Sequence, residues 1–236
     1  MSGLTTQTAW TVNVVSVSEF KAFARIDNSD STENTLIESL VFLAQDMAES
    51  YTGRAITYQI QQLFLDRLPF YADEKLQEGV YTGADLQANP NYIALPKPNL
   101  ISVDHVKYYD NNNNASTFAA TNYYVDTTSQ QGRVVLKNGV SWPTASELRN
   151  ANAYEIQFKA GYGSSNSDTA ASTPKLLIHA IKVLTLHLYE NREVVTSMSV
   201  NMIPKTIGML LQPFTIKRLD RPVSYTHLTL PTNREV

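Results

Sequence analysis

The sequence contains no cysteine, which excludes disulfides, thiolate metal sites and cysteine nucleophiles. It has no apolar run approaching the roughly 18–20 residues that cross a bilayer, and its first ten residues show neither the basic start nor the apolar segment of a signal peptide. Positive charge is not in excess either, because 19 Lys and Arg stand against 22 Asp and Glu. Sequence-specific DNA binding is therefore disfavoured, and we expect a globular protein made in the cytosol.

The motifs that carry chemistry are also missing. There is no P-loop, no G-x-S-x-G elbow and no H-E-x-x-H sequence. Of the four histidines, only His179 and His187 share a predicted helix, and they lie eight residues apart, beyond the one-turn spacing of helical metal motifs. We expect no catalytic residue, no cofactor and no metal, and interpret the chain as non-enzymatic.

Two helices are predicted near the start of the chain. Ser16 and Glu19 have capping-box spacing before a short helix that ends near residue 27. Asp30 and Glu33 repeat that spacing before a long helix, and Gly53 stands where a left-handed C-cap belongs. The long helix has a wide apolar face made of Leu36, Ile37, Leu40, Val41, Leu43, Ala44, Met47, Ala48 and Tyr51.

A second long helix is predicted after residue 172. Thr173 is its expected N-cap, with Pro174 at the first helical position, and its apolar surface should pack against the helix of residues 31–52. Pro204 is expected to open a shorter helix that ends near Gln212.

Between the long helices the sequence is typical of β-structure. Alternation from Ala55 predicts a strand to about Leu68, followed by further strands near residues 92–95, 102–109, 123–126, 132–137 and 154–160. Residues 69–91 form a long polar connection, which is a functional-loop candidate without an assigned role.

These elements predict an α+β fold: a helical core of two long packed helices plus short helices, with an inserted small antiparallel β module and an extended C-terminal arm. The expected divisions are an N-terminal arm or edge strand (1–15), the N-terminal helical part of the core (16–54), a β-rich insertion (55–163), the C-terminal helical part of the core (164–199), a C-terminal docking arm (200–223) and a probable non-native tail (224–236).

One alternative function comes from the tyrosines. Tyr108, Tyr109, Tyr123 and Tyr124 could form an aromatic platform, and a carbohydrate-binding β module would use one. Tyrosine is also a favoured residue of strands and of subunit contacts, which explains the same pattern without a ligand.

Several short motifs together resemble the head-tail connector (adaptor) proteins of tailed bacteriophages over roughly residues 15–214. Arg25, Ile26 and Asp27 match a turn after the short helix, and Tyr51, Thr52, Gly53 and Arg54 match the end of the long helix. The likeness continues, in order, through Leu95-Pro96-Lys97-Pro98, Tyr123-Tyr124-Val125-Asp126, Gly132-Arg133-Val134, Trp142-Pro143, Phe158-Lys159-Ala160-Gly161-Tyr162-Gly163 and Tyr189-Glu190-Asn191-Arg192-Glu193.

The resemblance implies a structural subunit of the virion neck, made in the host cytoplasm, that forms a ring of about twelve copies between the portal protein and the next tail or neck protein. DNA would pass through the lumen during packaging and ejection without sequence-specific binding. The subunit-interface candidates are Glu38, Asp46, Glu49, Arg54 and Arg192. The portal-docking candidates are Met202, Ile203, Pro204, Lys205, Ile207, Leu210, Leu211, Phe214, Lys217 and Arg218.

The C-terminal arm leaves two possibilities open. Its apolar side chains suit a segment that becomes ordered on a partner, and they equally suit a helix that folds back on its own bundle. Residues 224–236 resemble translated vector sequence, so they take no part in the functional argument.

Overall fold

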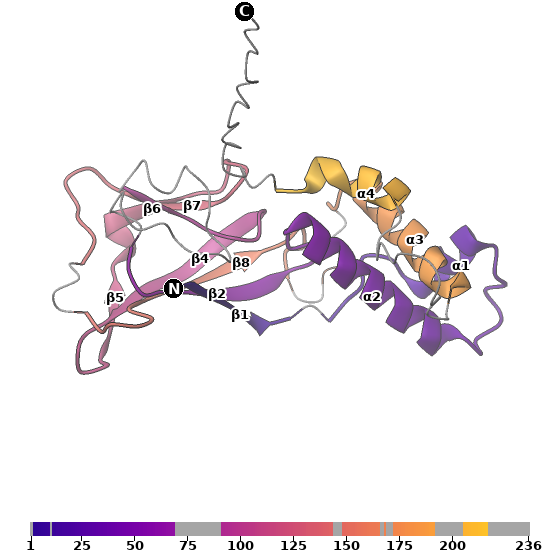
Figure 1. The fold of residues 1–236 in the computed structure, drawn as a ribbon, viewed down its shortest axis with the longest axis horizontal. Helices are drawn as coiled ribbons and strands as arrows, with labels where there is room; N and C mark the ends of the chain where they lie inside the picture. The colour runs from indigo at the N-terminus through magenta and orange to yellow at the C-terminus, as the bar shows by residue number, and fades with distance from the viewer. Residues whose placement is uncertain are drawn as a thin grey trace, which may run out of the picture.

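A computed structural model describes residues 2–9, 11–68, 91–143, 148–165, 168, 172–191 and 205–216. The molecule is elongated, with two β-sheets at one end and the helices gathered at the other (Figure 1). Residues 69–90, which make up nearly all of the long connection predicted at 69–91, lie outside these ranges, as do the short segment 144–147 and the tail.

Eight strands form two antiparallel sheets within the described residues. The five-stranded sheet has the order β1 (Ser2–Thr8), β2 (Gln59–Leu65), β8 (Tyr154–Ala160), β4 (Leu100–Tyr109) and β5 (Ala115–Phe118). The three-stranded sheet has the order β3 (Tyr92–Ala94), β7 (Arg133–Leu136) and β6 (Tyr123–Asp126). A short 3-10 turn, η2 (Ala120–Asn122), precedes β6.

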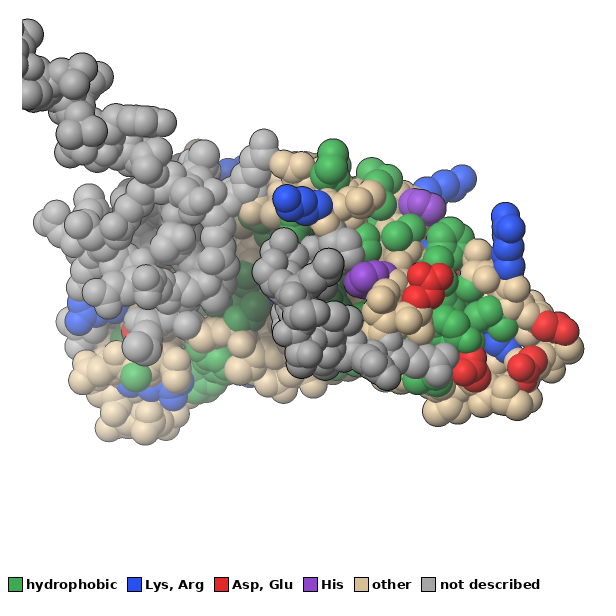
Figure 2. All heavy atoms as spheres, turned by 45° about the vertical axis from the view of Figure 1, so that its right-hand side comes forward, with side chains coloured by type: hydrophobic (Ala, Val, Ile, Leu, Met, Phe, Trp, Pro, Cys, Tyr) green, Lys and Arg blue, Asp and Glu red, His purple; other side chains and the backbone are tan. Residues whose placement is uncertain are grey.

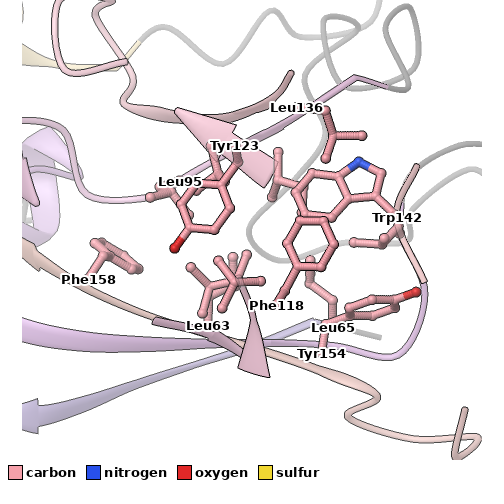
Figure 3. Packing of buried hydrophobic residues seen from close by; sticks show 14 of the residues in the cluster. Leu63, Leu65, Leu95, Phe118, Tyr123, Leu136, Trp142, Tyr154 and Phe158 are labelled. Carbon is pink, nitrogen blue, oxygen red and sulfur yellow. The ribbon is translucent and has the colours of Figure 1, made fainter. Parts of the chain in front are cut away.

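The two sheets share one apolar core. Alternate residues of β2 are buried, and in β8 the alternate residues Tyr154, Ile156, Phe158 and Ala160 belong to the core, as expected for strands with one face against another layer. Leu63 and Phe158 from the larger sheet meet Tyr123 and Leu136 from the smaller one (Figure 3). Phe118 lies between Tyr123 and Trp142, with ring centroids 6.0 and 5.3 Å away.

The helices have a separate core. It joins α1 (Val17–Ala24), α2 (Asn34–Thr52), α3 (Lys175–Glu190) and α4 (Lys205–Leu211), and a 3-10 turn, η4 (Gln212–Phe214), follows α4. α2 and α3 pack together along their buried faces, as predicted from their periodicity.

The predicted ends of these helices are only partly correct. The capping box of α1 is confirmed, because Ser16 Oγ accepts from the Glu19 amide at 3.2 Å and Glu19 Oε2 accepts from the Ser16 amide at 3.1 Å. Gly53 ends α2 with φ 70°, as predicted.

Two predicted N-caps are wrong. The Asp30 carboxylate accepts from the backbone and hydroxyl of Thr32, and α2 begins only at Asn34 with no side-chain cap. Thr173 is not the cap of α3 either, because the helix starts after Pro174 and makes no side-chain capping bond. In each case the helix begins later in the sequence than the capping spacing predicted.

The predicted fold class is wrong in its emphasis. A helical core with a small β insertion was expected, whereas the strands build two sheets around an extensive core of their own. β1, with the sequence SGLTTQT, lies at the edge of the larger sheet, which agrees with the edge-strand alternative for residues 1–15. β5, with the sequence ASTF, lacks a clear apolar alternation and was not predicted, so the sequence pattern underestimated the β content. Pairing with β2 makes β1 a strand, and pairing with β4 does the same for β5.

Candidate functional site

The solvent-facing side of α2 combines acids with large apolar residues. Glu38 and Asp46 are exposed, and α2 contains no Lys or Arg. Phe42 and Leu43 lie between these two acids in the sequence, and their exposed fractions are 46% and 44%. We call Glu38, Phe42, Leu43 and Asp46 the acidic face. Large apolar residues that cluster on a surface often mark an interaction site.

A second apolar row runs beside the acidic face. Leu36, Leu40, Leu43 and Met47 follow one another at intervals of four, three and four residues, which places them on one side of the helix. None of them is buried, and Leu36 and Leu40 are not packed against the helical core. Within the described residues, part of the apolar surface of α2 therefore lies outside the helical core.

The outer side of α3 has the opposite charge. Lys175 is exposed, Lys182 is half-buried, and Glu190 at the last position is the only acid in the helix. Leu176, with 41% of its surface exposed, and the half-buried Val183 lie beside these lysines. We call Lys175, Leu176, Lys182 and Val183 the basic face. Hydrophobic side chains are visible among charged ones over the helical half in Figure 2.

A buried polar network joins α2 to the larger sheet. Glu49 is only 2% exposed, and its carboxylate accepts hydrogen bonds from the Ile56 amide at 2.8 Å and from Gln59 Nε2 at 2.8 and 2.9 Å. Burial raises the pKa of Glu49, although these hydrogen bonds act in the opposite direction. The Gln59 side chain in turn accepts from Gln61 Nε2 at 2.7 Å.

The predicted interface residues therefore fall into different places. Glu38 and Asp46 lie on the acidic face, whereas the Glu49 carboxylate is occupied inside the chain and offers no surface. Arg54 is half-buried, donating to the Phe214 carbonyl and, at 3.5 Å, to Asn99 Oδ1. Arg192 lies outside the described residues.

The motifs that carried the family resemblance have local structural roles. Arg25 ends α1 in the left-handed conformation with φ 58°, and the Asp27 carboxylate accepts from the Ser29 amide at 2.9 Å in the following turn. At the end of α2, Thr52 accepts through its carbonyl from the Ile216 amide at 3.1 Å. Together with Arg54, this contact fixes the segment after α4 against the end of α2.

The described part of the C-terminal arm folds back on the helices. Ile207 and Leu211 are buried in the helical core, and the half-buried Leu210 and Phe214 pack against it. Lys205 is exposed. This arrangement corresponds to the second of the two possibilities left open by the sequence, and the other docking candidates, Met202, Ile203, Pro204, Lys217 and Arg218, lie outside the described residues.

The four tyrosines do not form a common platform. Tyr108 and Tyr109 belong to β4 in one sheet, whereas Tyr123 and Tyr124 belong to β6 in the other. Tyr123 is buried in the core against Phe118, and Tyr124 is 53% exposed. The geometry therefore gives no support to a carbohydrate platform made of these residues.

One polar cluster that the sequence did not indicate lies on the outer face of the larger sheet. Glu155 on β8 has one oxygen 2.8 Å from His105 Nε2, and the other accepts from the Tyr109 hydroxyl, both on β4. Burial acts to raise the pKa of Glu155, but the hydrogen bonds from Tyr109 and His105 outweigh it and lower the pKa. Because both oxygens are engaged, the cluster ties β8 to β4 and presents no free base.

The described part of the chain shows neither a metal cluster nor a membrane-spanning helix. No group of three or more His, Asp or Glu side chains there is placed to hold a metal ion. No helix in those ranges has both the length and the apolarity needed to span a bilayer.

Comparison with known proteins finds similarity in structure but not in sequence. No family model matches the sequence, and no curated protein does. The fold, however, is similar to a chain in the neck of an empty gene transfer agent (GTA) particle computed with C6 symmetry, with a TM-score of 0.68 and 20% identity over 93% of this chain and 100% of that chain.

Two related structures give the same result. A chain in the virion of the native GTA particle has a TM-score of 0.64 and 18% identity, over 92% of this chain and 96% of that one. A chain in the neck of the native particle, computed with C12 symmetry, has a TM-score of 0.63 and 19% identity, over 93% and 100%. The two-sheet and helical architecture is thus shared along nearly the whole of each chain.

Proposed function

We propose that this chain is a non-enzymatic structural subunit of the neck of a tailed-phage-like particle, where it forms a ring between the portal protein and the next neck or tail protein. The observation that carries the proposal is the fold similarity to a neck chain over the full length of that chain, with a TM-score of 0.68. A similarity confined to one sheet or one helical pair would support only a common module.

The residues that carry the sequence resemblance support the same assignment. Arg25 and Gly53 end α1 and α2 in left-handed conformations, and Arg54 holds the carbonyl of Phe214. These are positions at which the sequence resembles connector proteins, and each has a structural role that a shared architecture would preserve.

The symmetry of the similar neck structures, C6 and C12, supports a ring of identical copies. We propose twelve copies with DNA passing through the lumen. The net charge of −3 suits a channel that conducts DNA without retaining it, because an acidic wall repels the phosphates. Replacing lumen-facing acids with lysine should then slow DNA exit.

Docking on the portal is assigned to the C-terminal segment. Lys205 is exposed at the start of α4, and Met202, Ile203, Pro204, Lys217 and Arg218 flank the folded-back helix in sequence. In this proposal α4 anchors the segment to its own chain through Ile207 and Leu211, while the flanking residues reach the portal.

Cryo-electron microscopy of the full chain mixed with its portal protein tests the function. A closed ring seated below the portal is the expected result. The isolated chain can stay monomeric without conflict, because the portal can act as a template. A chain that does not associate with the portal and is missing from purified particles would contradict the proposal.

A further inference from the structure

The acidic face and the basic face point away from each other within one chain. α2 and α3 pack together through the residues that build the helical core, such as Ile37, Val41, Leu177 and Leu184. The exposed residues of each helix lie on its other side. A single chain therefore cannot bring its acidic face onto its own basic face.

A ring provides the geometry that the single chain lacks. In a closed cyclic ring every copy meets its neighbours through two different surfaces, one on each side, because a rotation repeats the same contact around the axis. Two surfaces of one chain that differ in charge and are directed apart satisfy this requirement. Contact between two acidic faces would bring Glu38 and Asp46 against the same acids of another copy, which is unfavourable.

The apolar residues on both faces complement each other in the same way. Leu43 on α2 and Leu176 on α3 each expose more than a third of their surface. Interfaces commonly bury an apolar centre inside a rim of charges, which here would be Glu38 and Asp46 on one side and Lys175 and Lys182 on the other.

We propose that, in the ring, the acidic face of α2 of one copy packs against the basic face of α3 of the next copy. This contact rests on the proposed ring function, and its partner is a second copy of the same chain. Leu43 and Leu176 occupy its apolar part, and the acids of α2 face the lysines of α3. Because Glu38, Asp46 and Lys175 are exposed to solvent, the contact weakens as ionic strength rises.

Charge reversal tests the contact in the full chain assembled on its portal. The acid variant carries Glu38→Lys and Asp46→Lys, and the base variant carries Lys175→Glu and Lys182→Glu. Each variant places like charges across the contact, so the yield of assembled ring should fall about tenfold or more relative to the natural sequence. The chain with all four substitutions restores opposite charges and should recover the ring.

The control is Lys137→Glu, which reverses an exposed lysine just after β7, away from both helical faces. It should assemble like the natural sequence. Circular dichroism and thermal unfolding of each variant show whether the monomer is intact. Normal rings from both double variants, or no recovery in a folded fourfold variant, would overturn the contact.

The outcomes separate the contact from the function on which it rests. If the natural chain forms no ring on the portal, the proposed function fails. If the natural chain forms a ring and the double variants form it equally well, the function stands and only the α2–α3 contact is refuted.

Discussion

Glu49 on α2 and Gln59 on β2 are hydrogen-bonded at 2.8 and 2.9 Å inside the chain, at the point where the helices meet the larger sheet. Glu49 is 2% exposed, and its carboxylate accepts hydrogen bonds from the Ile56 amide and the Gln59 side-chain amide, while the charge of Lys97 also favours its ionised form. Such a group has a cost in the folded state that depends on pH.

Because burial raises the pKa of Glu49 above its ordinary 4.5, its contribution to stability is fully present below that pH and is lost as pH rises through the folded value. Gln at this position does not titrate. The free energy of unfolding of Glu49→Gln, relative to the natural sequence, should therefore increase between about pH 4 and about pH 7. Urea unfolding at both pH values measures this difference.

Two further variants make the test specific. Glu38→Gln makes the same change at an exposed acid of the same helix and is the matched control for the loss of one carboxylate. Glu49→Ala leaves the Ile56 amide and the Gln59 amide group without their acceptor and should cost about 1–3 kcal/mol for each buried donor. A pH-independent difference for Glu49→Gln would mean that the carboxyl is not perturbed by burial.

The backbone at Gly161 gives a second prediction. Its φ is 131°, and a Cβ there would lie 2.1 Å from the Thr57 carbonyl oxygen. Gly161→Ala should therefore strongly reduce the thermal unfolding temperature, because β8 and the segment before β2 must separate. Gly139→Ala is the matched control: φ is 78° there and the space is open, so only the backbone strain of about 1 kcal/mol remains.

The stacked aromatic residues give a third prediction, which concerns the core between the sheets. Phe118→Ala removes the ring that lies between Tyr123 and Trp142 and should reduce the free energy of unfolding by about 3–5 kcal/mol. Tyr124→Ala changes an exposed aromatic residue of β6 in the smaller sheet and should change the free energy of unfolding by no more than about 0.5 kcal/mol. Equal effects in chemical denaturation would contradict the shared core.

The sequence predicted elements whose apolar residues repeat strongly. The positions of α2 and α3 follow from helical periodicity, and those of β4 and β8 from short runs bounded by turns. It left residues 1–15 open between an arm and an edge strand, and it gave no signal for β5, so the share of β-structure was underestimated. β1 is stabilised by pairing with β2, which is distant in sequence, and β5 by pairing with β4, from which a turn separates it.

The sequence predicted only part of the acidic face and its neighbours, because contacts distant in sequence decide which acids are buried. Glu38 and Asp46 stand opposite the apolar face of α2, which the sequence shows directly. Glu49 has the same residue type and a similar position, but Gln59 and the Ile56 amide bury it, and no helical pattern contains that contact. Lys175 and Lys182, seven residues apart on one side of α3, could have been found from spacing alone.

The folded-back α4 gives the last prediction, because its two sides should respond differently to the same substitution. Ile207 is buried in the helical core, so Ile207→Asp places a charge among apolar residues and should reduce thermal stability strongly. Met209, two residues further along, is 71% exposed, so Met209→Asp should leave the unfolding temperature almost unchanged. If α4 instead left the core to dock as a free arm, Ile207→Asp would be as harmless to the isolated chain as Met209→Asp. Differential scanning calorimetry of the two variants without portal protein distinguishes these cases.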